Sequence, residues 1–301
     1  MIHMKVKWLN SRRTRNLFGF ALLVPAIIIL GLLFVNPILS LIQTSLTDKN
    51  LLKPKSGEWI GFENYLWMLT EEDFWDALSK SMVYTIGVTS ASIILSMAIA
   101  LLMNFKFRGR RICFALILLP WVTSYMASAF VYTLLYDYSY GVFNYIFCDV
   151  LKLIPRQNWL GDLKTVMGAV ITVSVWHFLP FSILVLTNAI RQVPTELYES
   201  GRIDGAGVVR LYWNITLPMI KPSLVTLLIV RIAAVFKSFD SIFLLTKGGP
   251  GNATTTLPLY YYDISFGSYR IGKGAAVGVA LILIVLLIYF VLIKMFGEDA
   301  V

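Results

Sequence analysis

Four ionisable side chains lie in segments that are otherwise apolar, and they indicate where this sequence could bind something. Arg231, Lys237 and Asp240 are the only charged residues in six apolar windows, which cover 17–44, 81–104, 112–135, 165–190, 222–246 and 274–293. His177 lies in the fourth window. Ionisable groups are costly in hydrocarbon, so inside a membrane they usually mark a transport path, a proton relay or a ligand site. The chemistry depends on what the windows are.

The six windows have the length and composition of membrane-spanning helices. Each contains at least 20 residues, and about 20 residues are needed to cross the hydrocarbon layer. Over the whole chain 57% of the residues are apolar and only 14% are charged, which excludes a water-soluble globule. Strands of a membrane β-barrel would alternate polar and apolar residues, and runs such as AIIILGLLF do not. We predict an all-α polytopic membrane protein with six transmembrane helices.

Basic residues are concentrated in alternate connections. They lie in the amino-terminal tail, in the turn 106–111 and in the connection 191–221, whereas 45–80 has seven acidic residues against four lysines. This positive-inside pattern predicts a multi-pass membrane protein with both termini in the cytoplasm. It also explains the net charge of +9 without a nucleic-acid partner. The first window is too long for the core of a signal peptide, so we expect it to be retained.

The connections predict a division of the chain at residue 80. Residues 1–80 would comprise the tail, the first transmembrane helix and an outer surface segment in which Trp59, Trp67 and Trp75 recur every eight residues. Residues 81–301 would form a core of five transmembrane helices. Cys113 and Cys148 are expected on opposite sides of the membrane, too far apart for a disulfide.

The connection 195–218 is longer than a turn between two helices requires. Pro194 precedes a predicted helix over 195–203, Asp204 and Gly205 interrupt it, and a second helix is predicted over 207–214. We expect Pro218 and Pro222 to end that helix before the fifth span. The sequence therefore predicts a helical hairpin outside the membrane, on which a partner docks.

Residues 196–218, ELYESGRIDGAGVVRLYWNITLP, resemble the EAA loop of ABC-importer permeases. Glu199, Gly205, Ile215, Leu217 and Pro218 follow the spacing of that motif, while Ser200 and Gly201 replace its usual two alanines. Five further segments match in order, namely GFENY, LLPW, YGVFN, WLGD and LTKGGPGNATTTLPLYYY. Together they resemble the first of the two permeases in the carbohydrate-uptake class.

This resemblance implies a bacterial inner-membrane location, a cytoplasmic coupling-helix loop and a set of partners. The ATPase-coupling positions would be Glu199, Ser200, Gly201, Asp204, Gly205 and Ala206, with Glu199 pairing with an arginine of a nucleotide-binding subunit. The partners would be a second homologous permease, two ATPase subunits, an extracytoplasmic solute-binding protein, the saccharide and the lipid bilayer. We expect this chain to be non-catalytic and to bind no cofactor or metal, with ATP and Mg on the partner subunits.

A glycine-rich stretch at the last span superficially resembles a phosphate-binding loop. Gly267, Gly272 and Lys273 have the spacing of that motif, but Gly274 replaces the required Ser or Thr and no strand precedes it. We interpret Gly274 and Gly278 as a small-residue face for close packing.

The resemblance also implies a substrate path. In an ungapped alignment with the maltose-type permease, the sugar-contacting positions fall on Trp121, Tyr125, Ser174, His177, Phe178, Phe181, Arg231, Ala234, Val235 and Ser238. Arg231 replaces a neutral polar residue there, and a guanidinium suits a carboxylate or phosphate. Our hypothesis is an acidic saccharide, such as a uronic-acid oligomer, or a phosphorylated polyol as cargo. Pairing of Arg231 with backbone carbonyls, or with an acid of the sister subunit, is the structural alternative.

Lys237 and Asp240 are three residues apart, so on one helix we expect them to pair with each other. An acid left unpaired in the membrane could instead serve a proton relay, which makes a proton-coupled secondary sugar transporter the alternative function. Such transporters usually have inverted repeats, and we find none. A membrane enzyme has little support, because no metal-ligand or nucleophile-base group is evident.

Overall fold

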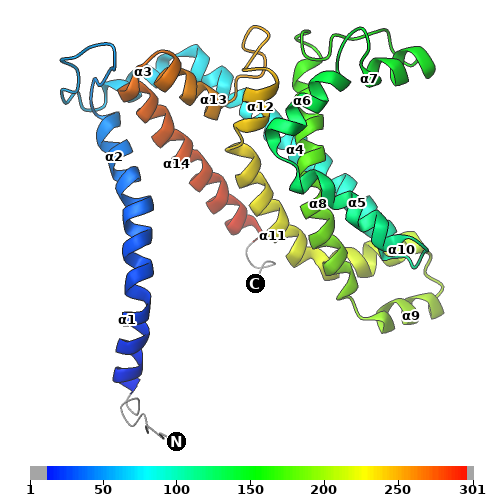
Figure 1. Ribbon diagram of the computed structural model, residues 1–301. Coiled ribbons are helices and arrows are strands. Elements are labelled where there is room, and N and C mark those ends of the chain that lie inside the picture. Colours follow the sequence, from blue (N-terminus) through cyan, green and yellow to red (C-terminus); the bar gives the residue numbers. More distant parts are fainter. Residues whose placement is uncertain (1–11, 297–301) are drawn as a thin grey trace, which may run out of the picture. The chain divides into compact units, whose positions relative to one another are not determined.

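The computed structural model describes residues 12–296, and its regular structure there is helical apart from one isolated β-bridge between Thr47 and Trp59 (Figure 1). Five helices are long and apolar enough to cross a membrane: Leu22–Ser45, Glu72–Asn104, Val166–Arg191, Val208–Phe236 and Ile271–Phe296. A sixth crossing would be the pair Arg110–Val122 and Tyr125–Leu135, which is bent by 102°. The predicted all-α class with six membrane segments is confirmed.

The elements follow in this order: α1 (Arg12–Leu30), η1 (Gly31–Val35), α2 (Asn36–Ser45), α3 (Glu63–Thr70), α4 (Glu72–Asn104), α5 (Arg110–Val122), α6 (Tyr125–Leu135), α7 (Val142–Asn144), η2 (Tyr145–Val150), α8 (Val166–Arg191), α9 (Thr195–Ile203), α10 (Val208–Leu211), η3 (Tyr212–Thr216), α11 (Leu217–Phe236), α12 (Asp240–Leu245), α13 (Leu257–Tyr262), η4 (Asp263–Gly267) and α14 (Ile271–Phe296). The η elements are π-helical turns that continue into a neighbouring helix.

The described residues form two compact units. The first combines 12–68 with 264–279, and the second combines 69–263 with 280–296. This grouping differs from the predicted division at residue 80, because the start of α14 packs with the first outer segment. Gly272 explains part of that packing, since a Cβ atom there would lie 2.1 Å from the carbonyl oxygen of Thr47. Gly274 is also tightly packed, against Oγ of Ser265 in η4.

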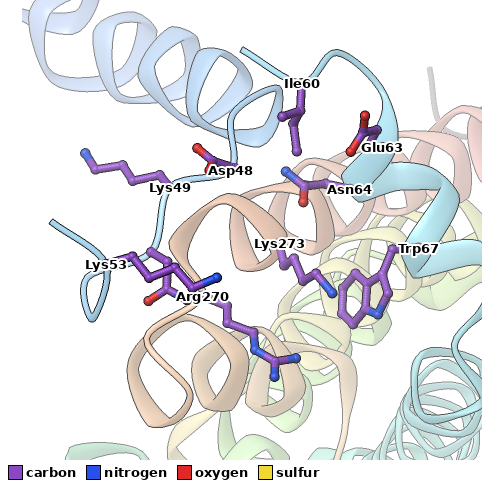
Figure 2. Close-up of a pocket in the computed structure, with 10 residues that line it drawn as sticks. Asp48, Lys49, Lys53, Ile60, Glu63, Asn64, Trp67, Arg270 and Lys273 are labelled. Carbon is purple, nitrogen blue, oxygen red and sulfur yellow. The ribbon is translucent and has the colours of Figure 1, made fainter. Parts of the chain in front are cut away.

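The first unit contains a pocket of about 510 Å³ where α2 ends and α14 begins (Figure 2). The backbone N–H of Gly272 donates to the carbonyl of Lys49 at 2.8 Å, which holds these two ends together. The end of the first span and the start of the last therefore lie on one side of the membrane, and the chain between them crosses an even number of times. Since α4, α8 and α11 cross three times, the bent α5–α6 pair must supply the fourth crossing.

Helices α4, α8 and α11 form the core of the second unit. Their contact is lined by small and β-branched residues, among them the fully buried Val88, Val170 and Val235. Gly87 lets α4 approach α8 closely, because a Cβ atom there would lie 2.8 Å from Cδ1 of Ile171. Buried serines on α4 donate their hydroxyls to backbone carbonyls of the same helix, as Ser92 donates to the carbonyl of Val88. Close packing of small residues is the usual route to helix association in lipid.

Two of the predicted spans are interrupted. The window 112–135 breaks at Thr123, where Ser124 takes an extended conformation and its Oγ accepts from the N–H of Ala127 at 3.2 Å, which begins a new helix. The window 222–246 breaks after Phe236, and α12 begins only at Asp240. The predicted pairing of Lys237 with Asp240 is therefore wrong, since the two residues do not share a helix and no ion pair joins them in the described chain.

The predicted end of a helix at Pro218 and Pro222 is also wrong. Residues Val208–Phe236 run as one helix through both prolines. The π-helical turn η3 directly precedes Pro218, so this proline lies where the regular hydrogen-bond pattern is already interrupted.

Candidate functional site

Arg231 on α11 is bonded to the middle of α8. Its Nη2 atom donates to the carbonyl of Phe178 at 3.0 Å and to Oγ of Ser182 at 2.7 Å. The guanidinium carbon also lies 4.8 Å from the ring centroid of Phe178 and 5.6 Å from that of Phe181. Phe178 lies twelve residues into α8, about 18 Å along its axis. A buried cation is thus fixed near the centre of the helix bundle.

The guanidinium keeps unused donor capacity. Arg231 is only 4% exposed, and its Nε atom has no hydrogen-bond partner within residues 12–296. The Nδ1 atom of His177 is likewise buried and has no partner in the described chain. Buried polar atoms without partners are costly unless something else satisfies them.

Aromatic rings from the bent pair α5–α6 lie against α8. The Tyr125 and His177 ring centroids are 3.9 Å apart with planes inclined by 32°, and those of Trp121 and Phe181 are 5.8 Å apart. Trp121 is 51% exposed. Because the bend falls between Trp121 and Tyr125, one of these aromatics lies on each side of it. Such rings offer flat apolar faces to a ligand.

The ten predicted path residues separate into two groups. Eight border the bend and the neighbouring part of α8 and α11, either partly exposed or with unsatisfied polar atoms: Trp121, Tyr125, His177, Phe178, Phe181, Arg231, Ala234 and Ser238. Ser174 and Val235 are fully buried beneath them. The Ser174 hydroxyl lies 2.7 Å from the hydroxyl of Tyr84, and Val235 belongs to the α4–α8–α11 core.

Two residues of this site were missed in the sequence. Ser182 holds Arg231, and Tyr84 holds Ser174. The signal for Ser182 was present, because it lies one turn beyond Phe178 on the same face of α8 and could have been matched to the only arginine of the apolar windows. Tyr84 lies on α4, and nothing in the sequence relates its register to that of α8.

The predicted helical hairpin between the fourth and fifth spans is present. Its second arm is the start of the 29-residue helix Val208–Phe236, which is longer than the about 20 residues that a crossing requires. Helix α9 covers Thr195–Ile203 as predicted, Gly205 adopts a left-handed conformation with φ of 76°, and α10 and η3 follow. The N–H of Ala206 donates to the carbonyl of Gly201 at 2.9 Å and closes the turn. Glu199, Ser200, Asp204 and Gly205 are exposed, and Glu199 forms no ion pair within residues 12–296.

Gly201 has a role inside the hairpin. A Cβ atom at this position would lie 2.7 Å from Cδ2 of Leu211 and 3.1 Å from Cδ1 of Ile215. The Tyr198 hydroxyl also lies 3.0 Å from Oγ1 of Thr216. Helix α9 is therefore packed tightly against α10 and η3, and the hairpin can move as one body.

Apolar side chains project from this hairpin. Ile203 is 87% exposed, Val208 79%, Val209 71% and Trp213 60%. Exposed apolar side chains gathered outside a membrane segment usually mark a protein interface. We did not identify this patch from the sequence, although each residue lies within the EAA-like segment.

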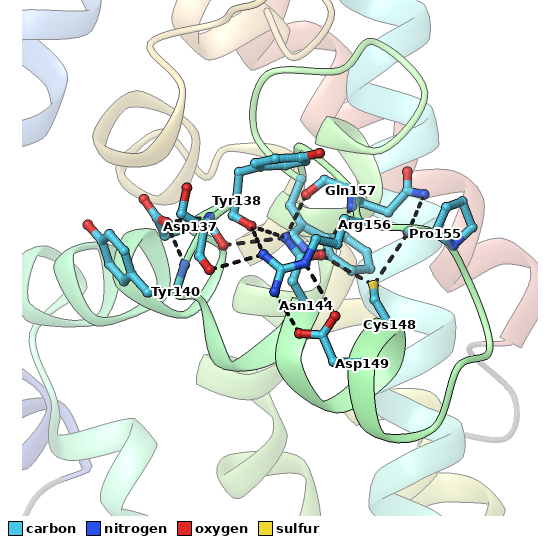
Figure 3. Close-up of polar contacts among 11 residues, drawn as sticks. Asp137, Tyr138, Tyr140, Asn144, Cys148, Asp149, Pro155, Arg156 and Gln157 are labelled. Carbon is cyan, nitrogen blue, oxygen red and sulfur yellow. Dashed lines mark hydrogen bonds and ion pairs between the residues drawn. The ribbon is translucent and has the colours of Figure 1, made fainter.

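The connection between α6 and α8 is held by a network of hydrogen bonds and one ion pair (Figure 3). Asn144 is its centre, donating to the carbonyl of Gln157 at 2.9 Å and accepting from its N–H at 3.1 Å. Arg156 donates to both oxygens of the Asp149 carboxylate, at 2.7 and 3.3 Å, and to the carbonyls of Tyr138 and Ser139. The long loop is thereby fixed on the side opposite the hairpin.

Comparison with known proteins agrees with this arrangement. Residues 92–296 match the family described as the binding-protein-dependent transport system inner membrane component. The chain belongs to this family of permeases. The trehalose/maltose transport system permease protein MalF of Thermococcus litoralis is 32% identical to it, over 93% of this permease and 95% of that protein. The sulfoquinovosyl glycerol transport system permease protein SmoG of Agrobacterium fabrum is 31% identical, over 88% and 86%.

A solved structure has the same fold as this permease. It is a bacterial ABC transporter involved in the import of the acidic polysaccharide alginate, with a TM-score of 0.81, 24% identity and coverage of 94% of this permease and 96% of that chain. The family match and the relatives of 31–32% identity confirm the predicted resemblance to ABC-importer permeases. The resemblance covers the helical hairpin and the bundle alike.

Proposed function

We propose that this permease forms half of the translocation pore of an ATP-driven saccharide importer. One observation carries the proposal: this member of the permease family has both a helical hairpin with an exposed apolar patch and a buried site that is cationic and aromatic. Relatives named for trehalose/maltose, sulfoquinovosyl glycerol and diacetylchitobiose transport support a saccharide cargo. Family membership favours this function over a proton-coupled secondary transporter.

The coupling mechanism rests on the stiffness of the hairpin. ATP binding would close two partner ATPase subunits, which carry ATP and Mg, and their movement would push on residues 195–218. Glu199 would pair there with a basic residue, while Ile203 and Val208 bury their exposed side chains. Because η3 continues into α11, the push would reach Arg231 along one helix. The chain itself would perform no catalysis and bind no cofactor.

The exposed face of the site requires partners. A second, homologous permease would face Trp121 and Tyr125 and complete the pore, and an extracytoplasmic solute-binding protein would deliver cargo to the side opposite the hairpin. In this topology both termini lie in the cytoplasm. One related structure was solved in complex with an alginate pentasaccharide-bound periplasmic protein, which supports such a delivery step.

The cargo we propose is an acidic saccharide. The alternative to an anionic cargo was that Arg231 pairs with backbone carbonyls. Arg231 does donate to the carbonyl of Phe178, but its bonds to Phe178 and Ser182 use Nη2 alone. The Nε atom remains to meet a carboxylate, and Trp121 and Tyr125 would stack on the sugar ring. Arg231→Gln should then reduce uptake of an acidic oligosaccharide more than tenfold while a neutral sugar loses less. An equal loss for both cargoes would refute the acidic preference.

The transport class is tested separately. Uptake in membrane vesicles should stop when the ATPase partner carries an inactivating substitution, and it should continue with a protonophore. Affinity purification through a tag on this chain should recover an ATP-hydrolysing subunit from the wild type. A charge reversal, Glu199→Arg, should weaken that recovery, whereas reversal of the neighbouring Glu196 should not. Uptake that survives loss of ATP hydrolysis would overturn the proposal.

A further inference from the structure

The pocket of the first unit concentrates positive charge. It is lined by four basic side chains, two acidic ones, two asparagines, an isoleucine and a tryptophan: Lys49, Lys53, Arg270, Lys273, Asp48, Glu63, Asn50, Asn64, Ile60 and Trp67. Figure 2 shows these side chains around the space between the outer segment and the start of α14. A volume of about 510 Å³ is that of a small-ligand site.

The basic residues outnumber the acidic ones by four to two, so the lining has a net positive charge. The Asp48 carboxylate accepts from the backbone N–H groups of Gly57 and Glu58, at 2.6 and 2.8 Å. Lys49, Lys53 and Arg270 take part in no side-chain hydrogen bond or ion pair within the described chain. Like charges gathered around one cavity repel one another, so an anion in the pocket would relieve that repulsion.

The pocket lies at the level of lipid headgroups. It begins three residues after α2 ends at Ser45, and Arg270 directly precedes the first residue of α14. Trp67 lies beside it with the ammonium group of Lys273 4.0 Å from its ring centroid, and tryptophan is typical of membrane interfaces. Just below, the helix Leu22–Ser45 has no buried residue in its apolar window, with Leu39 53% and Ile42 40% exposed.

We propose that this pocket binds the phosphate of an anionic phospholipid, with the acyl chains lying along α2. The ligand must carry negative charge for the basic residues and an apolar tail for the exposed side chains beneath, and a phospholipid has both at the required spacing. The leaflet is the one opposite the α9–α10 hairpin, because three crossings separate α2 from α9. Basic pockets between transmembrane helices bind anionic headgroups on the cytoplasmic side, and the same electrostatic attraction would act in this leaflet.

The test is a lipid titration of the transporter isolated through a tag on this chain. After delipidation in detergent, native mass spectrometry would measure binding of phosphatidylglycerol and of phosphatidylcholine. The wild type should bind phosphatidylglycerol at least tenfold more tightly. The double variant Lys49→Gln, Lys53→Gln should lose that preference, as should Arg270→Gln, which serves if the double variant does not fold.

The matched control is Lys152→Gln, Lys164→Gln, which removes two exposed lysines from the same side of the membrane and outside the pocket. It should keep the wild-type preference. An equal loss in this control, or equal binding of the two lipids by the wild type, would overturn the proposal. So would competition by soluble glycerol 1-phosphate at the lipid's own concentration, because the ligand would then be a small phosphate ester. Loss confined to the pocket variants supports the lipid.

Discussion

Arg231 and Ser182 join α11 to α8 through a buried 2.7 Å hydrogen bond, and the same guanidinium nitrogen also bonds to the carbonyl of Phe178 on α8. A charge so placed is held by the bundle itself, and the cargo does not have to order it. The bond therefore has a structural effect that can be measured apart from transport.

Removing the Ser182 hydroxyl should loosen the α8–α11 contact. Ser182→Ala deletes one interhelical hydrogen bond, and such bonds contribute on average about 0.6 and at most about 1.7 kcal/mol in a membrane. We expect a small decrease in unfolding temperature in detergent. Ser90→Ala is the control, because the exposed Ser90 bonds only to its own helix. Equal unfolding temperatures for Ser182→Ala and Ser90→Ala would contradict a stabilising bond between Ser182 and Arg231.

Gly201 should be more sensitive to alanine than Gly207. On helix propensity alone, Gly201→Ala would stabilise α9 by up to about 1 kcal/mol. The added Cβ, however, meets Leu211 at 2.7 Å, and overpacking costs about 1–3 kcal/mol. Gly207 has no atom within 4 Å of its added Cβ and an ordinary φ of −72°.

The measurement is the ATP hydrolysis rate with and without cargo in the reconstituted transporter. Gly201→Ala should reduce the stimulation by cargo at least threefold, and Gly207→Ala should leave it unchanged. Normal stimulation in both variants would mean that the packing of α9 on α10 is not required for coupling.

The sequence predicted the membrane segments because charge and length alone define them. Charge and length did not predict the helix breaks at 123–124 and 237–239, because the sequence stays largely apolar there although the helix is interrupted. The break before Asp240 depends on the packing of α12 against α6, which no pattern within the window reports. The hairpin was predictable from Pro194, Asp204 and Gly205, since these residues act locally.

The site was predictable only where one residue carried the signal. Arg231 stands out as the first charged residue inside any of the apolar windows, so its importance is visible in the sequence. The burial of Ser174 and Val235 is not visible in the sequence. It depends on how α8 and α11 are rotated about their axes relative to α4. Gly201 was expected to serve a partner, whereas its close contact with Leu211 is internal and follows from the fold of the hairpin.

The outer loop should depend on pH through Asp137. Its carboxylate accepts from the N–H groups of Tyr140 and Ser139, at 3.1 and 2.8 Å, and these bonds hold its pKa below the ordinary value. Because the pKa of Asp137 is lower in the folded than in the unfolded protein, its carboxylate stabilises the fold at pH values above the unfolded pKa of about 3.9. This contribution disappears as pH falls through the folded pKa.

Hydrogen exchange of residues 138–158 measures this effect. Wild type should be better protected than Asp137→Asn at pH 7, and the difference should shrink as pH falls below about 3.9 and vanish once the pH is below the lowered folded pKa. Comparing both proteins at each pH cancels the intrinsic pH dependence of exchange. A difference that persists unchanged into acid would show that the carboxylate charge is not what holds the turn.

Asn144 should determine whether the outer loop is ordered. It is 1% exposed, and besides its two bonds to Gln157 it accepts from Nε1 of Trp159 at 3.0 Å. Asn144→Ala leaves these partly buried groups without partners, at up to about 1–3 kcal/mol for each. Because about 1.4 kcal/mol changes an equilibrium tenfold, trypsin cleavage after Lys152 should accelerate at least tenfold in the purified protein. Asn158→Ala, an exposed neighbour, should cleave at the wild-type rate, and similar rates for both variants would refute a central role for Asn144.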